Sequence, residues 1–335
     1  MFPGDRVNLD VAETTALRCL AVNRYDDFRP DVALLLKEQE SHLAPADPRA
    51  RSGDGLGALG AAASLARLYA LGALIKTGLY CRLVYTNWVL GWFREFHEYW
   101  VTELGNRPLN PHDFYFLAGV YRQRLQTIHF DSMENPQLAT DERHLEAWRD
   151  HRIVNHLFSH TYRHALSPLR VHRYTRYLRR GGRVAEYGCG TAPILAALAR
   201  WYRHLNVHLV GADIPHLLFH FARWKFRDAR FVTMVPIAPN DDAPLSGRYD
   251  AIFCLEVLEH LPRPIPVLAH LHEVLEPGGY LVFDYIRSDA TGLDTASSLR
   301  DRIPALKFLL ERFEIVEGAV PLDGGHVEGV VARKR

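Results

Sequence analysis

The sequence predicts an α/β fold, a doubly wound and mostly parallel seven-stranded sheet, preceded by a helical N-terminal domain. Short apolar runs alternate with segments of helical period after residue 166, which is typical of parallel strands joined by helices. A glycine-rich turn joins the first of these strands to its helix, and residues 61–100 are rich in Ala and Leu at helical spacing. We therefore expect two domains, residues 1–165 and residues 166–335.

The composition excludes several classes of protein. The chain has 335 residues, 48% of them hydrophobic, and a formal net charge of +1, so neither global disorder nor a nucleic-acid partner is expected. The longest apolar runs, Leu68–Ile75 and Leu83–Phe93, are shorter than the roughly 18–20 residues that span a bilayer. Four dispersed cysteines without a Cys-x-x-Cys pair, and no visible signal peptide, favour a cytoplasmic protein.

The helical N-terminal half is expected to contain three long helical regions. Residues 61–100 contain no proline and repeat apolar residues at three- and four-residue spacing. Pro108 and Pro111 break this pattern, and helical regions follow at about 113–128 and 141–164.

The second half is predicted to contain seven strands and four helices. The strands are expected at 183–187, 207–212, 230–235, 249–255, 279–285, 313–320 and 326–334. The helices are expected at 193–202, 215–226, 265–275 and 296–309. The last two strands follow one another closely and are expected to pair as an antiparallel edge.

The glycine turn after the first strand is the strongest functional signal. It reads Glu186-x-Gly188-x-Gly190-x-Ala192-Pro193, and glycines at such a turn let the backbone approach a nucleotide-like ligand. A dinucleotide fingerprint needs a small residue where Pro193 stands, and a pyrophosphate is poorly matched by the carboxylate of Glu186. The turn therefore favours a cationic ligand.

This turn resembles motif I of the class I S-adenosylmethionine-dependent methyltransferases, with Ala192 in place of a third glycine. Three further segments resemble the family pattern in the same order: residues 210–214 the second strand, residues 249–261 the fourth and residues 275–283 the fifth. Four motifs in register are far more specific than one.

The resemblance implies S-adenosylmethionine as the cofactor and assigns roles to its binding residues. Gly188 and Gly190 would pass beneath the methionine portion, and Glu186 would meet its ammonium through water or backbone. Asp213 would accept both ribose hydroxyls.

Other residues are implied on the two sides of the cofactor. Leu255 and Glu256 would line the methionine side. The adenine would rest against Ile237, with Asp241 or Asp242 in the place where the family commonly has an acid.

The resemblance supplies no universal catalytic residue, because methyl transfer needs a base only if the acceptor must lose a proton. We expect His260, Asp284 or Tyr285 to face the acceptor, since they stand at or just after the ends of predicted strands. The alternative for His260 is that it only caps or packs the following loop.

Two groups of histidines could suggest a metal site. His156, His160 and His164 are spaced to share one helix face, and His216 and His220 form a second pair. No completing ligand motif accompanies either group, so we interpret them as solvated or packing residues and expect no metal.

An aromatic stripe runs along the predicted 79–100 helix and includes Trp88, Trp92, Phe96 and Trp100. Such a stripe is usually core, but residues 1–165 exceed what the second domain needs. The N-terminal domain is thus expected to form a lid over the acceptor pocket or the surface of a homodimer.

Together these features predict an enzyme that transfers a methyl group from S-adenosylmethionine to an oxygen, nitrogen or carbon of a small molecule, with specialised metabolism as one setting. The segment after the fourth strand lacks the Asn-Pro-Pro-Tyr or Asp-Pro-Pro-Tyr signature of amino-DNA methylation. The alternatives are a protein or lipid methyltransferase, and a non-catalytic S-adenosylmethionine-binding scaffold or partner subunit.

Overall fold

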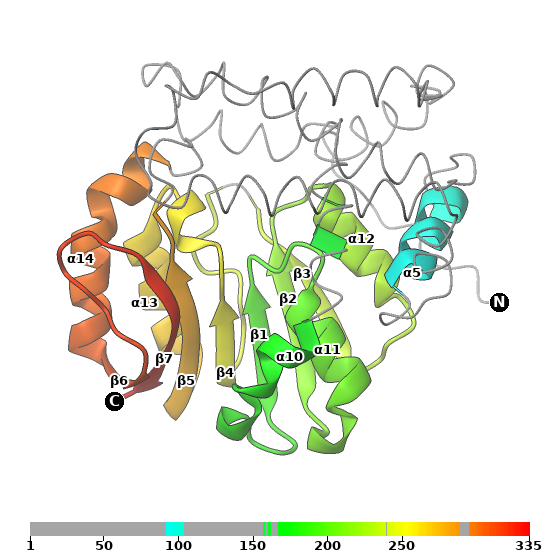
Figure 1. Ribbon diagram of the computed structural model, residues 1–335, viewed down its shortest axis with the longest axis horizontal. Helices are drawn as coiled ribbons and strands as arrows, with labels where there is room; N and C mark the ends of the chain where they lie inside the picture. The colour runs from blue at the N-terminus through cyan, green and yellow to red at the C-terminus, as the bar shows by residue number, and fades with distance from the viewer. Residues whose placement is uncertain (1–91, 104–156, 158–159, 162–166, 239, 288–294) are drawn as a thin grey trace, which may run out of the picture. The chain divides into compact units, whose positions relative to one another are not determined.

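The computed structural model describes residues 92–103, 157, 160–161, 167–238, 240–287 and 295–335. Its central feature is one seven-stranded sheet with the strand order β3-β2-β1-β4-β5-β7-β6 (Figure 1). The strands are β1 (Arg183–Tyr187), β2 (His208–Asp213), β3 (Val232–Pro236), β4 (Tyr249–Cys254), β5 (Leu275–Tyr285), β6 (Phe313–Glu317) and β7 (Val327–Lys334). The first five strands are parallel to one another, whereas β7 pairs antiparallel with both β5 and β6. The predicted seven-stranded and mostly parallel sheet is confirmed.

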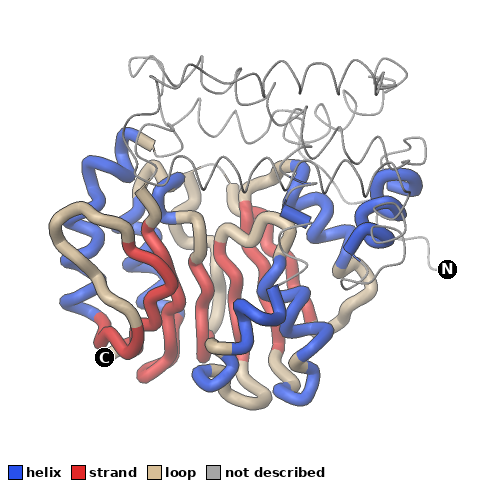
Figure 2. Tube along the Cα trace, in the orientation of Figure 1, coloured by secondary structure: helices blue, strands red, loops and turns tan. Residues whose placement is uncertain are grey.

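Helices join the parallel strands. The α-helices of this part are α10 (Ser167–His172), α11 (Pro193–Trp201), α12 (Leu217–Lys225), α13 (Pro264–Val274) and α14 (Ala296–Arg312). Short 3-10 helices are η6 (Thr175–Tyr177), η7 (Arg203–Leu205) and η8 (Leu258–His260). Figure 2 shows these helices flanking the strands of the sheet.

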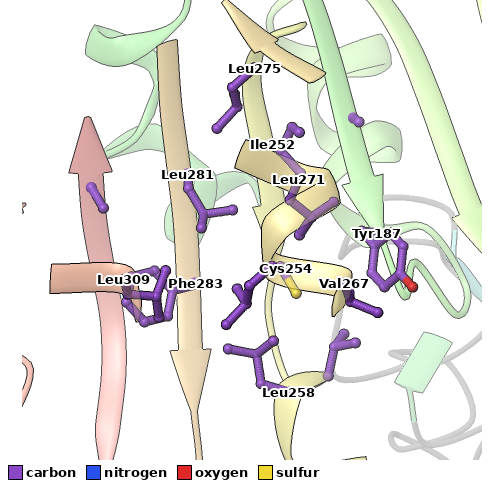
Figure 3. Close-up of a cluster of buried hydrophobic side chains, with 14 of the residues drawn as sticks. Tyr187, Ile252, Cys254, Leu258, Val267, Leu271, Leu275, Leu281, Phe283 and Leu309 are labelled. Carbon is purple, nitrogen blue, oxygen red and sulfur yellow. The ribbon is translucent and has the colours of Figure 1, made fainter. Parts of the chain in front are cut away.

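The sheet has an apolar core on each face, because neighbouring residues of a strand point to opposite sides. On one face, Val184 and Leu209 lie in a core with α10, α11 and α12 residues such as Leu195 and Phe219. The opposite face contributes a second core, which α13 and α14 cover. Figure 3 shows part of this second core: Phe283 of β5 lies beside Leu309 of α14, and Ile252 of β4 lies near Leu271 of α13. Since α11 and α12 cover one face and α13 the other, the sheet is doubly wound.

The element boundaries depart slightly from those predicted. β5 begins at Leu275 rather than at residue 279, because Leu275 already pairs with Tyr249 before a register shift. α14 continues to Arg312, three residues beyond the predicted end, and Thr295 caps its first turn by accepting from the amide of Ser298.

The N-terminal half is described only in part. α5 (Trp92–Glu98) and the π-helical turn η2 (Tyr99–Glu103) belong to a compact unit, Ala21–Arg124, that is separate from the unit containing the sheet. The remainder of the predicted helices at 61–100, 113–128 and 141–164 lies almost wholly outside the described residues, as does the predicted boundary at residue 165. Among the helices that the structure describes, none is long and apolar enough to cross a membrane.

Candidate active site

The carboxyl ends of the parallel strands bring the predicted site residues to one edge of the sheet. Glu186 of β1 stands in register with Gly211 of β2 and Phe253 of β4. Phe283 of β5 pairs with Cys254 of β4, just before the segments that carry Asp284 and Glu256. The carboxyl edge at a point where the chain order reverses is where such folds bind ligands.

The glycine loop after β1 passes close to both neighbouring strands. The amides of Gly188 and Cys189 donate to the carbonyl of Ala212, at 2.8 and 3.2 Å. On the other side, a Cβ on Gly188 would overlap with Cγ2 of Val257, and Gly188 has a φ of +68°. Both the space and the left-handed backbone therefore require glycine at position 188.

Gly190 has a different environment. Its φ is +49°, but a Cβ there would meet nothing nearer than Leu218 Cδ2 at 3.7 Å. Its amide donates to Oδ2 of Asp213 at 2.6 Å, while Oδ1 of Asp213 accepts from the amide of Ile214 at 2.7 Å. The carboxylate at the end of β2 is thus tied to the glycine loop, in the place where an acid would meet ribose hydroxyls.

Glu186 anchors the helix that follows the glycine loop. Its two carboxylate oxygens accept from the amides of Ile194 and Leu195, at 3.2 and 3.0 Å, in the first turn of α11. Burial raises the pKa of Glu186 to about 8, against the opposing effect of these two hydrogen bonds. A direct contact of Glu186 with a methionine ammonium stays a prediction.

This arrangement also bears on which ligand the edge can hold. Dinucleotide-binding folds place a pyrophosphate on the free amides of the helix that follows the glycine turn. Here Glu186 already occupies two amides of that turn and adds a buried carboxyl group. The site is therefore matched to a ligand with donors and a positive charge rather than to a phosphate.

His216, interpreted from the sequence as a solvated or packing residue, is buried and contacts the acid that ends β2. It precedes α12, where its Nδ1 accepts from the amide of Phe219 at 3.1 Å, and its Nε2 lies 3.4 Å from Oδ1 of Asp213. Serine, threonine, aspartate and asparagine are the usual residues at such a position, so an imidazole there is hard to recognise. The signal was its place, three residues after the acid that ends β2. The neighbouring His220 is buried, which lowers its pKa to about 4.

The side expected to hold adenine is bounded by Ile237. This side chain is buried, and its amide donates to the carbonyl of Asp213 at 2.7 Å. Both acids expected on this side have partners in the protein. Oδ1 of Asp241 accepts from the amide of Ala243 at 2.9 Å, and Asp242 pairs with Arg263 at 3.1 Å.

The segment after β4 is held by β5. Leu255 and Glu256 are half-buried, and Glu256 has a left-handed φ of +56°. The amide of Glu256 donates to Oδ1 of Asp284. Burial, followed by the nearby charge of Glu256, raises the pKa of Asp284 to about 7, although its hydrogen bond to that amide and the charge of Arg170 act in the opposite direction.

The three candidate catalytic residues are placed very differently. His260 lies at the end of η8 with 21% of its side chain exposed, and its Nε2 is 4.0 Å from Oε1 of Glu259. Asp284 is buried at the end of β5, beside Glu256. Both therefore stay candidates at the carboxyl edge.

Tyr285 requires a correction. It is 1% exposed, its hydroxyl donates to the carbonyl of Ser298 in α14 at 2.6 Å, and the guanidinium of Arg302 lies 4.4 Å from its ring centre. The residues of a strand alternate between its two sides, so Tyr285 points away from the side that Asp284 occupies. The geometry gives Tyr285 a packing role instead of the expected catalytic one.

Only parts of the aromatic stripe and of the histidine ladder are described. Phe96, Tyr99 and Trp100 are buried, and the rings of Phe96 and Trp100 stack with their centres 5.8 Å apart, as core residues do. Trp88, the side chain of Trp92, His156 and His164 lie outside the described residues. Within the described ranges, no group of histidine, cysteine, aspartate or glutamate is arranged to hold a metal.

The chain is similar to methyltransferases over its second half. Residues 158–317 match the family model of a methyltransferase domain. The ubiquinone biosynthesis O-methyltransferase of Xanthomonas campestris pv. campestris (strain B100) is 31% identical over 121 residues, 35% of this chain and 49% of that protein. Its counterpart in Azotobacter vinelandii is 31% identical over 126 residues, 37% of this chain and 53% of that protein. The chain thus spans about half the length of the curated relatives it matches.

Solved structures of methyltransferases are similar at lower identity. The CurJ carbon methyltransferase has 19% identity and a TM-score of 0.43, covering 68% of this chain and 72% of its own. Magnesium protoporphyrin IX methyltransferase from Synechocystis PCC 6803 with bound S-adenosylmethionine has 17% identity and a TM-score of 0.37, covering 69% and 100%. Through the match to the family model, the region of residues 158–317 is similar to methyltransferase domains.

The residues at the carboxyl edge fit the cofactor of this family. S-adenosylmethionine carries ribose hydroxyls and an ammonium as donors, together with a sulfonium charge, and the edge offers the carboxylates of Asp213 and Glu256 as acceptors. Two amides in the first turn of α11 already donate to Glu186, and a Cβ on Gly190 would meet nothing nearer than Leu218. The donor and acceptor pattern therefore agrees with this cofactor.

Proposed function

We propose that the chain is a methyltransferase that transfers the methyl group of S-adenosylmethionine to a hydroxyl oxygen of a small molecule. The observation that carries this proposal is the carboxylate of Asp213, which accepts a hydrogen bond from the amide of Gly190. Beside it, two amides in the first turn of α11 already donate to Glu186, so they are not available to a phosphate. This is a site for a cationic nucleoside, on a domain of the methyltransferase family. Oxygen is preferred over nitrogen and carbon because the two relatives described above are named O-methyltransferases.

The cofactor, when bound, supplies an electrophilic methyl group on a sulfonium. In the proposed site Asp213 would accept hydrogen bonds from the ribose hydroxyls, and the half-buried carboxylate of Glu256 would offset positive charge on the methionine side. The acceptor oxygen would receive this methyl group, and the electron pair of the broken carbon–sulfur bond would remain on the sulfur atom. The hydroxyl proton passes to His260, whose imidazolium the nearby carboxylate of Glu259 stabilises.

The cofactor part of the proposal is tested at Asp213. Asp213→Ala should weaken binding of S-adenosylhomocysteine by about 1.5–3 kcal/mol, because the ribose hydroxyls and the amide of Gly190 lose a charged acceptor. Titration calorimetry measures this loss. The matched control is Asp228→Ala, which removes an exposed carboxylate that pairs with Arg227 away from the site. Normal binding by Asp213→Ala would remove the proposed cofactor site.

The catalytic part is tested at His260 with a panel of small hydroxylated acceptors and mass spectrometry of the products. His260→Ala should lower turnover by about 10²–10⁴-fold, as expected for a lost general base, and leave the affinity for S-adenosylhomocysteine unchanged. A loss confined to stability would assign His260 to packing, and an unchanged rate would exclude it as the base.

The same panel separates the remaining alternatives. Cofactor binding without any methylated product would favour the scaffold, and methylation of a protein or a lipid in place of every small acceptor would favour those substrate classes.

A further inference from the structure

The loop after β4 contains a conformation that needs external support. Glu256 has a φ of +56°, a left-handed backbone that residues with a side chain rarely adopt. Such conformations persist only where the surrounding structure determines them, and they gather at functional sites. Glu256 therefore needs a contact that holds it in this state.

Asp284 supplies that contact. Phe283 pairs with Cys254, so the next residue of β5 stands beside the first residues that leave β4. There Oδ1 of Asp284 accepts from the amide of Glu256, and the aspartate is only 6% exposed. A buried carboxyl group that accepts an amide hydrogen bond fixes the orientation of that peptide.

The left-handed turn at Glu256 determines where Val257 lies. Val257 is buried and fills the space that a side chain at position 188 would occupy, so it packs directly against the glycine loop. The opposite side of that loop is bonded to Ala212 and Asp213 of β2. Val257 is thus the contact through which the β4 side confines the cofactor-binding loop.

The chain after Val257 is held independently. The carbonyl of Glu259 accepts from the amide of Thr295 and from the hydroxyl of Ser298, at 2.9 and 2.6 Å, which ties η8 to the start of α14. Glu256 therefore lies between two anchored segments, and the hydrogen bond that its amide donates to Asp284 decides its conformation.

We propose that Asp284 is a positioning residue, whose side chain holds the left-handed turn at Glu256 and thereby keeps Val257 against Gly188 in the cofactor-binding loop. In this role Asp284 acts as a hydrogen-bond acceptor and takes no proton from the acceptor substrate. The inference rests on the proposed function where it concerns cofactor binding, and its structural core can be tested without any ligand.

The ligand-free test is a double-mutant cycle in urea unfolding with Asp284→Ala, Glu256→Gly and the double variant. Glycine adopts a left-handed φ without strain, so the Glu256→Gly background should need the support of Asp284 less. We expect Asp284→Ala to destabilise the wild-type chain clearly more than the Glu256→Gly chain. Additive effects would overturn the proposal. Failure of the wild type to bind S-adenosylhomocysteine would instead overturn the proposed function and leave this result intact.

The functional test compares the affinity for S-adenosylhomocysteine and the turnover of two variants. Asp284→Ala should raise the Kd about tenfold, the size expected of a lost hydrogen bond to a charged group. Asp284→Asn keeps an oxygen that accepts from the amide of Glu256, so its Kd should stay within about threefold and its turnover should be retained. An unchanged Kd with turnover lowered at least about 100-fold in Asp284→Asn would identify a general base and overturn the proposal.

The matched control is Asp250→Ala. Asp250 also joins two strands through a carboxylate, because its Oδ2 accepts from the amide of Arg183 at 2.7 Å, but at the opposite end of β1 and β4. This variant should lose stability and keep its affinity for S-adenosylhomocysteine. An equal loss of affinity in Asp250→Ala would show that the effect at Asp284 is general destabilisation. Should Asp284→Ala fail to fold, Asp284→Asn still separates positioning from base catalysis.

Discussion

At the scale of single residues, the two glycines of the cofactor loop have different reasons to be glycine. Gly188 has both a left-handed φ and no room for a Cβ, since Val257 fills that space. Gly190 has only the left-handed φ, and the space beside it is open as far as Leu218. The two positions therefore respond differently to the same substitution.

We expect Gly188→Ala to be clearly more damaging than Gly190→Ala. The left-handed backbone costs alanine about 1–2 kcal/mol at either position, and the overlap with Val257 adds to that cost at position 188 only. Urea unfolding and calorimetric titration with S-adenosylhomocysteine measure both effects. Val257→Ala should partly rescue Gly188→Ala, because it removes the overlapping Cγ2, and it should not rescue Gly190→Ala. Equal losses at the two positions would contradict this account.

Asp284 and Tyr285 illustrate how neighbours on one strand take different tasks. Asp284 points to the loop after β4, and Tyr285 points to α14, where its hydroxyl meets the carbonyl of Ser298. Both residues end a strand at the edge where ligands bind, so position along the chain made both candidates. The alternation of the strand separates them.

At the scale of elements, the two helices beside the cofactor loop begin at side chains that also belong to the site. Glu186 accepts from amides of α11, and His216 accepts from an amide of α12 while lying 3.4 Å from Asp213. Glu186 therefore holds the first turn of α11, and His216 contacts both the first turn of α12 and Asp213.

The two contacts of His216 can be separated by substitution. His216→Asn offers an oxygen that can cap α12 but has no group in the place of Nε2, whereas His216→Ala loses both contacts. We expect the alanine variant to be about 0.5–2 kcal/mol less stable than the asparagine variant, the usual range for an N-cap. Both should bind S-adenosylhomocysteine more weakly than the wild type, since Asp213 loses a neighbour in each. The control is His204→Asn on the exposed η7, which should change neither quantity. Wild-type affinity in His216→Asn would show that the imidazole serves α12 alone.

At the scale of the whole domain, the sheet is covered on both faces and carries buried ionisable groups along its carboxyl edge. Burial raises the pKa of Asp284 to about 7 and that of Glu186 to about 8, and it lowers the pKa of His220 to about 4. The folded state therefore binds protons at the two acids more tightly than the unfolded chain does. The free energy of unfolding must therefore depend on pH in the range from about 4 to about 8.

The contribution of Asp284 to this dependence has a definite sign. Its pKa rises on folding, so its contribution to stability is complete below the ordinary pKa of 3.8 and is lost as the pH rises toward about 7. Asparagine does not titrate, so Asp284→Asn should become more stable relative to the wild type between pH 4.5 and pH 7.5, by at least about 1 kcal/mol. Urea unfolding of both proteins at the two pH values measures the change. A difference that stays constant, or that moves in the opposite direction, would contradict the raised pKa. The comparison with Asp284→Asn isolates this group, because Glu186 and His220 titrate in both proteins.

Residue order alone determined the alternation of strands and helices, the glycine turn and the acid that ends β2, because periodicity, turn residues and motif spacing are local properties of the chain. The sequence pattern therefore predicts the seven-stranded sheet and places Gly188, Gly190 and Asp213 at one edge of it. Only the tertiary structure decided what each side chain touches there. Asp284 meets the amide of Glu256 across two strands, Tyr285 meets α14, and Val257 fills the space at Gly188. These contacts join residues between 13 and 69 positions apart, and the packing of strands and helices in three dimensions determines which of them meet.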